Sequence, residues 1–260
     1  MDMLLIGGLL VIIITIAIVY TIVKSILKTA IISISIFFVV AAILVGIVYI
    51  DGLDVQEKFT KEDKTLVFMY KDNVISGTKG KFLEENQVPQ LFSDAKVKEM
   101  NDYYLAKNFD LMKSDSYKLI NIDFSVFDDI TEISLMENTT MNRQEIINAM
   151  ESKDIRRAII IKELEKRNNI IYNKLSGAQL EEFNLEINNT LSELSKNSIN
   201  DDSQMRGAIL MSMMQKKTEA AKSIGWLISE LKTGKIVIYT ESPVFIAAKY
   251  LPDSLLIQTN

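Results

Sequence analysis

The chain has no cysteine and no histidine among its 260 residues. Without cysteine it has no disulfides, no thiol nucleophile and no thiolate ligands for a metal or an iron–sulfur cluster. Without histidine it lacks the usual general base near neutral pH and the commonest zinc ligand. The two absences exclude Ser–His, Cys–His and zinc-hydrolase mechanisms, and we expect neither a metal site nor another cofactor.

Charge is almost missing from the first fifty residues, where only Asp2, Lys24 and Lys28 are charged. The uncharged stretches Met3–Val23 and Thr29–Ile50 would each form a helix of about 31–33 Å, enough to cross a bilayer core of about 30 Å. The sequence therefore predicts a transmembrane helical hairpin with spans at about 3–23 and 29–50. A buried helical pair in a soluble protein is the alternative, but soluble helices rarely run this far without a charge.

Lys24 and Lys28 would lie in the tight turn between the two spans. Because basic residues concentrate in cytoplasmic loops, the turn is predicted to be cytoplasmic and the chain after Ile50 extracytoplasmic. Three lysines between positions 58 and 64 weigh against this orientation. No ionisable residue lies deep inside either span, whereas a transporter usually needs one. The sequence thus predicts a two-span anchor in the cell membrane, with the lipid bilayer as a partner.

From residue 51 onward the chain is charged and polar, with a net charge of about −6. Such a charge repels nucleic acid, which is therefore not an expected partner. A polar linker is predicted over 51–64 and an α+β domain over 65–260. Segments rich in β-branched and aromatic residues predict short strands at 65–70, 74–80, 117–124, 131–137 and 235–240. The last strand is expected to join the sheet formed by the first ones, and short helices are predicted at 95–107 and after Ser242.

Between about residues 141 and 232 the apolar residues recur at helical spacing. A short helix precedes a longer one that opens at Ser152 or Asp154 and ends near Gly177, and another helix is predicted over about 203–232. Five apolar residues between these two helices follow at steps of three, four, four and three: Leu180, Phe183, Ile187, Leu191 and Leu194. This seam predicts an antiparallel helical hairpin inserted in the α+β domain, and it is a candidate interaction face for a protein partner or a second copy.

Four methionines lie close together in one predicted helix, at positions 205, 211, 213 and 214. Clustered thioethers can bind Cu(I), whereas methionine also fills irregular cores. At 100° per residue the four side chains do not share one face of a helix. We therefore predict that they pack in the core and bind no metal.

The Ser-x-x-Lys motif would offer a nucleophile and a base without histidine. It occurs at Ser25–Lys28, Ser76–Lys79, Ser93–Lys96 and Ser229–Lys232. The companion motifs of Ser–Lys enzymes are absent, so no catalytic role is predicted.

Two further groups of residues are better explained by structure than by chemistry. Asp123, Asp128, Asp129, Asp201 and Asp202 could act as acid, base or cation ligands. Their spacing matches no calcium loop, so capping and surface roles are predicted. The segment 77–81, "GTKGK", lacks the full spacing of a phosphate loop, and a hairpin turn is predicted there.

Together these observations predict a membrane-anchored, non-catalytic interaction or scaffold protein that presents a folded domain at the membrane surface. One alternative is an anchored domain that senses a small ligand, with "KIVIYTESP" at 235–243 as the rim of its pocket. A second alternative is a hydrolase that uses carboxylates or a Ser–Lys pair. It would need two of these residues to meet in a cleft with strongly shifted pKa values.

Overall fold

The structure, a computed structural model, describes residues 34–59, 61–81, 89–136, 139–196, 199–221 and 225–252. The chain divides into two compact units, Met1–Gly52 and Leu53–Asn260. The described chain mixes helices and strands and begins with an apolar helix, so the predicted fold class is confirmed at that level. The first predicted span, with Lys24 and Lys28, lies outside the described residues.

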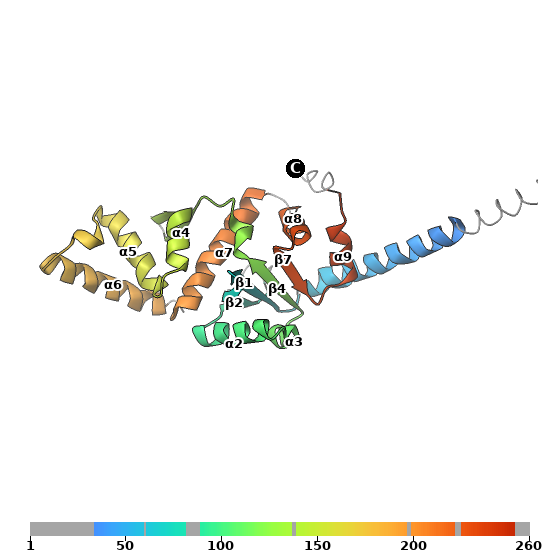
Figure 1. Cartoon of the computed structure of the whole chain (residues 1–260), viewed down its shortest axis with the longest axis horizontal. Coiled ribbons are helices and arrows are strands. Elements are labelled where there is room, and N and C mark those ends of the chain that lie inside the picture. The colour runs from blue at the N-terminus through green and yellow to red at the C-terminus, as the bar shows by residue number, and fades with distance from the viewer. Residues whose placement is uncertain are drawn as a thin grey trace, which may run out of the picture. The chain divides into compact units, whose positions relative to one another are not determined.

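The N-terminal helix of the described chain is Ile34–Phe59 (Figure 1). Its 26 residues have a mean hydropathy of 2.6 in their most apolar part, where no residue is buried. At about 1.5 Å per residue it is about 39 Å long. Among the described residues it is the one helix long and apolar enough to cross a membrane, a weak indication because it rests on length and composition alone.

This helix continues through Gly52, where the sequence predicts a polar linker. An interior glycine costs about 1 kcal/mol of helix stability. Lys58 pairs with Asp54 at 2.9 Å, one turn earlier, and Lys61 pairs in the same way with Glu57 at 2.8 Å. Pairs at this spacing stabilise a helix, which is consistent with its extension beyond the predicted boundary.

A five-stranded sheet with the order β3-β2-β1-β4-β7 forms the centre of the second unit. Its strands are β1 (Lys64–Tyr70), β2 (Asn73–Gly80), β3 (Gln90–Leu91), β4 (Lys118–Asp123) and β7 (Ile236–Tyr239). The β1–β4 pair is parallel, and the other neighbours are antiparallel. Lys71 and Asp72 both have positive φ and form the two-residue β1–β2 turn. The predicted strands of this sheet are confirmed, as is the return of the last strand to it.

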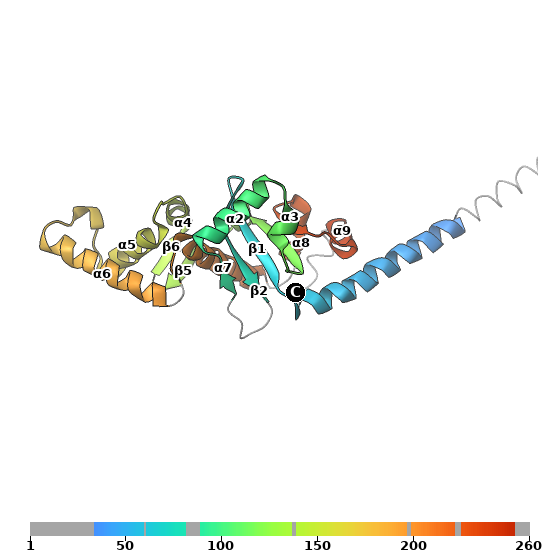
Figure 2. The ribbon, with the colours of Figure 1, turned by 90° about the horizontal axis from the view of Figure 1, so that it is seen from below.

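Both faces of the sheet are covered, which is why the middle of β1, Leu66 to Met69, is a continuous apolar run instead of an alternating one. Val67 and Met69 point to one face, where α2 (Asp94–Leu105) and α3 (Phe109–Lys113) pack. Leu66 and Phe68 point to the other face, which is covered by α7 (Asp202–Ala221) and the 3-10 helix η1 (Phe124–Phe127). Figures 1 and 2 show α2 and α7 on opposite sides of the strands.

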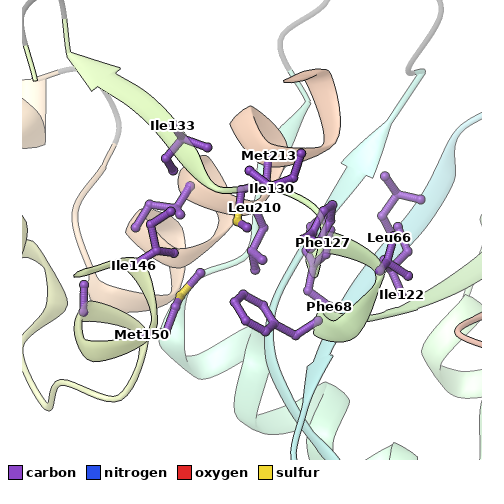
Figure 3. Close-up of a cluster of buried hydrophobic side chains, with 14 of the residues drawn as sticks. Leu66, Phe68, Ile122, Phe127, Ile130, Ile133, Ile146, Met150, Leu210 and Met213 are labelled. Atoms are coloured by element: carbon purple, nitrogen blue, oxygen red, sulfur yellow. The ribbon is translucent and has the colours of Figure 1, made fainter. Parts of the chain in front are cut away.

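The larger core is continuous from the sheet into the helical part of the unit (Figure 3). The remaining elements are β5 (Glu132–Met136), β6 (Thr139–Asn142), α4 (Arg143–Met150), α5 (Ile155–Asn168), the 3-10 helix η2 (Tyr172–Lys174), α6 (Ala178–Lys196), α8 (Gly225–Thr233) and α9 (Pro243–Lys249). In Figure 3, Leu210 and Met213 of α7 lie between Phe127 and the side chains of Ile146 and Met150 from α4. α7 therefore joins the sheet to the helices.

α7 approaches the sheet closely because it carries a glycine at the contact. A Cβ atom on Gly207 would lie 2.7 Å from Ser76 Oγ and 2.9 Å from Leu91 Cδ2. The Ser76 hydroxyl is buried and donates to the Ser203 carbonyl at 2.7 Å. This contact fixes the position of α7 on β2.

Two predicted helix boundaries differ from the structure. α5 ends at Asn168, and Asn169 adopts the left-handed conformation that ends a helix, whereas the sequence predicts an end near Gly177. The predicted helix over 203–232 is described as α7 and α8, and residues 222–224 between them lie outside the described residues. α8 contacts β7 and α9, whereas α7 contacts β2 and β5.

Candidate functional site

A pocket of about 330 Å³ lies where α5, α6 and α7 meet. It is lined by Ile159, Glu163, Arg167, Thr190, Glu193, Leu194, Ile199, Met205, Ala208, Ile209 and Ser212. Ile159, Met205 and Ile209 are at most 4% exposed and form an apolar floor that belongs to the larger core. The volume lies at the lower end of the range for small-molecule sites, about 300–1,000 Å³.

Glu163 brings a carboxylate into this pocket from α5. Its Oε2 atom is buried and accepts no hydrogen bond within the described chain. Burial raises the pKa of Glu163 above its usual value of 4.5, and the negative charge of Glu186 adds to the rise, while Arg167 opposes it. A buried carboxylate oxygen without a partner is costly, and such groups are rare in native proteins.

The other polar groups of the pocket are mostly acceptors. Among the described residues that line it, Arg167 is the one cation, and this guanidinium binds Glu186 on α6. The Thr190 hydroxyl donates to the Glu186 carbonyl at 3.0 Å, and the Ser212 hydroxyl donates to the Ala208 carbonyl at 3.0 Å. Because these protons are already engaged, the hydroxyls present only lone pairs to the pocket.

The predicted seam of α6 packs against α5 in a separate apolar cluster. Phe183 and Ile187 are buried there with Ile160 and Leu164 of α5. The other seam residues, Leu180, Leu191 and Leu194, are half-buried, and the last two pack against the same cluster. The seam is thus occupied within the chain, so an outside partner would reach only its half-buried margins.

The predicted pocket rim at 235–243 contributes no residue to the pocket described above. β7 is an edge strand of the sheet, and its Tyr239 stacks on Phe109 with 4.1 Å between ring centroids. Burial raises the pKa of Tyr239, and the nearby Tyr104 adds to this. Ser242 precedes α9 as predicted, but its side chain makes no capping hydrogen bond.

The aspartates considered as acids, bases or ligands make structural contacts. Asp123 caps η1, Asp128 pairs with Arg143, and Asp129 pairs with Lys217 at 3.1 Å.

Asp201 and Asp202 lie at the start of α7. Asp201 accepts from the Gln204 amide at 3.0 Å, and Asp202 accepts from the Arg156 amide at 3.4 Å. Within the described part of the chain, no three acidic side chains are grouped as a metal would require.

The Ser-x-x-Lys motifs show no catalytic arrangement in the described contacts. Ser76 is buried against α7, while Lys79 binds Asp115. Ser93 caps α2, and Lys96 pairs with Glu99 at 3.0 Å. The pair at Ser25 and Lys28 lies outside the described residues.

The methionines of α7 lie in the core, as predicted: two are buried in it and two pack against it. The prediction of a turn at 77–81 is wrong, because residues 77–80 belong to β2, with Gly77 inside the strand. A Cβ atom there would be 2.5 Å from the Phe92 ring and 2.9 Å from the Leu66 carbonyl oxygen. This glycine is therefore explained by packing.

One feature of the sequence indicates a buried acidic residue at the pocket. Ile155, Ile159, Glu163 and Arg167 follow each other at steps of four, which places them in one row along α5. The two isoleucines are at most 1% exposed, so an acidic residue next in this row enters buried surroundings.

Comparisons with protein-family models, with curated proteins and with solved structures found no match to this chain.

Proposed function

We propose that the chain is a membrane-anchored, non-catalytic binding protein that presents its α+β unit at the membrane surface. The observation that carries this proposal is the helix Ile34–Phe59, whose apolar part has no buried residue. In water such a surface would be costly, at roughly 25 cal/mol per Å² of apolar area, whereas a bilayer removes the cost. The uncharged stretch Met3–Val23 supplies the second proposed span.

The proposed orientation places the turn with Lys24 and Lys28 in the cytoplasm and the α+β unit outside. The support is the pair of lysines in the short turn that follows the first proposed span.

The proposed binding surface for a protein partner or a second copy lies on the α5–α6 pair, which we interpret as an antiparallel hairpin. Its seam is occupied by α5, so the surface is the outward side of α6, where Leu185 is 62% exposed. A non-catalytic role is supported by the structural contacts of the candidate aspartates and serines.

Extraction and labelling of the full chain test the anchor and its orientation. The protein should stay with membranes in alkaline carbonate, and its release into the supernatant would contradict the anchor. Single cysteines at Lys24 and Glu182, in an otherwise cysteine-free chain, report orientation through a membrane-impermeant thiol reagent on intact cells. Glu182 is suitable because its side chain is exposed on α6. Labelling at 182 alone is expected, and labelling at 24 alone would reverse the orientation.

A second proposed function is the binding of a small ligand by the same anchored unit. It is favoured by the pocket between α5, α6 and α7, which combines an apolar floor with polar groups from all three helices around it. This function is compatible with the first, because a ligand there would contact both helices of the proposed interaction surface.

A further inference from the structure

The pocket between α5, α6 and α7 is shaped for a ligand with an apolar body. Ile159, Met205 and Ile209 close its floor, and Leu194 and Ile199 add apolar surface from the α6 side. A volume of about 330 Å³ is at the small end of known sites and therefore suits a small ligand.

The polar groups around this floor select for a hydrogen-bond donor. Glu163 and Glu193 bring carboxylates, and the hydroxyls of Thr190 and Ser212 have their protons engaged with backbone carbonyls. Arg167 is the exception, but its guanidinium is bound to a glutamate of α6. The pocket therefore offers acceptors and uncompensated negative charge, a combination that an anion or a pure acceptor would not match.

Glu163 is the acceptor best placed to recognise such a donor. Its side chain is half-buried, whereas Glu193 is exposed at the edge of the pocket. Its Oε2 atom is buried and has no hydrogen-bond partner among the residues that the structure describes. Because Glu163 lines the pocket, an ammonium group bound there would give its carboxylate both a hydrogen bond and an opposite charge.

We propose that this pocket binds a small primary amine with an apolar body, and that Glu163 accepts hydrogen bonds from the ammonium group. The inference rests on the second function proposed above, since it names the ligand class for the same pocket. It requires no contribution from the membrane anchor.

The test uses the full chain in detergent and 2-phenylethylamine as the probe. Two molecules of similar size are the controls: 2-phenylethanol, which is uncharged, and phenylacetate, which is an anion. Calorimetric titration of the amine should give a Kd on the order of 1 mM or tighter, the affinity that about nine non-hydrogen atoms can provide. The alcohol and the anion should bind at least tenfold more weakly.

Two variants and one matched control locate the binding. Glu163→Gln keeps the shape of the side chain and removes its charge, so amine affinity should fall at least tenfold. Ala208→Leu fills the pocket from α7 and should abolish binding. Glu182→Gln makes the same chemical change on the exposed side of α6 and should leave the affinity unchanged. Circular dichroism and the unfolding midpoint verify that each variant is folded.

Three results would each contradict a different part of the proposal. Equal amine binding by the wild type and Glu163→Gln would overturn the role of Glu163. Tighter binding of the alcohol or the anion, lost in Ala208→Leu, would overturn the amine class and leave the ligand-binding function standing. No binding of any of the three probes would overturn the amine proposal and count against the ligand-binding function, without bearing on the membrane anchor.

Discussion

Lys217 of α7 is a buried cation whose removal gives a sharp test of the packing described above. Its side chain is 8% exposed, and its Nζ atom lies 3.1 Å from Asp129 Oδ1 and 3.1 Å from Glu230 Oε1. The same atom donates to the Val126 carbonyl at 2.5 Å and lies 5.6 Å from the centre of the Trp226 ring. The lysine thus ties α7 to α8 and to the chain around η1.

The expected effect of Lys217→Met is a loss of about 2–3 kcal/mol in the free energy of unfolding. Breaking a fully buried ion pair costs about 3–5 kcal/mol, because the remaining charge stays desolvated. Here Glu230 is 15% exposed and would be left without its nearest cation. The loss expected here is smaller than that for a fully buried pair, because Asp129 is 63% exposed and Lys235 Nζ lies 3.8 Å from the other oxygen of Glu230.

Lys71→Met is the matched control. Lys71 pairs with Glu151 at 2.8 Å, but the two side chains are 70% and 46% exposed. A surface pair of this kind contributes about 0–1 kcal/mol. Urea denaturation of the full chain in detergent, followed by circular dichroism, compares the two variants directly.

A double-mutant cycle isolates the Lys217–Glu230 interaction. If the loss comes from the desolvated carboxylate, Glu230→Gln should recover about 1–2 kcal/mol in the Lys217→Met background. A loss in Lys217→Met no larger than in Lys71→Met would refute the reasoning. The reasoning would also be refuted if the loss of stability in the double variant equalled the sum of the losses in Lys217→Met and Glu230→Gln.

Three further predictions use the same denaturation assay. Gly77→Ala should lose about 1–3 kcal/mol, because the new methyl group meets a backbone carbonyl and the Phe92 ring, and an unchanged midpoint would contradict that contact. Asn142→Ala should lose about 1 kcal/mol, because Asn142 and Glu145 form the capping box of α4, and an Asn142→Ala variant that keeps full stability would show the box to be unimportant. Burial raises the pKa of Glu163, so the folded state holds this proton more tightly than the unfolded state, and stability falls as the pH rises above about 4.5. The stability advantage of Glu163→Gln over the wild type should therefore grow from pH 4 to pH 7, and a difference independent of pH would argue against the raised pKa.

The strands of the sheet could be predicted because their signals are local. β1 is a continuous run of β-forming residues, which is what a strand buried on both faces requires. The following "KDN" marks a turn, and Lys71 and Asp72 take the left-handed conformations that a two-residue hairpin needs. Neither inference requires knowledge of distant parts of the chain.

The end of α5 could not be predicted in this way. Ile171 and Leu175 continue the apolar spacing of the helix, so periodicity alone extends it to Gly177. In the structure the chain turns at Asn169, and the Tyr172 amide after the turn donates to Glu165 at 2.8 Å. Leu175 still packs against the cluster between α5 and α6, from a position outside the helix. The apolar pattern thus predicted burial correctly but not the conformation that achieves it.

The pocket could not be predicted for a related reason: the sequence indicates an antiparallel helical hairpin with a third helix packed against it, but not which surfaces of the three helices meet. The seam of α6 indicates that a second helix covers Phe183 and Ile187, and α5 is close in sequence. Nothing local to the seam places α7 beside that pair, because the position of α7 follows from Gly207 and its contact with Ser76 across the sheet. A small residue can permit a close approach, but the sequence does not say which surface approaches it.

The row Ile155–Ile159–Glu163–Arg167 is the part of this site that can be recognised from the sequence. An acidic residue that continues a buried row must find a cation, take up a proton or have its oxygens satisfied by something else. Arg167, one turn later, is the local cation that could have satisfied Glu163, yet it binds Glu186 on α6. The contact that joins α5 to α6 therefore leaves the buried oxygen of Glu163 without a hydrogen bond, although the positive charge of Arg167 still acts on this carboxyl group. The charge left uncompensated in the pocket is a consequence of how the two helices pair, which is why it becomes visible only in the fold.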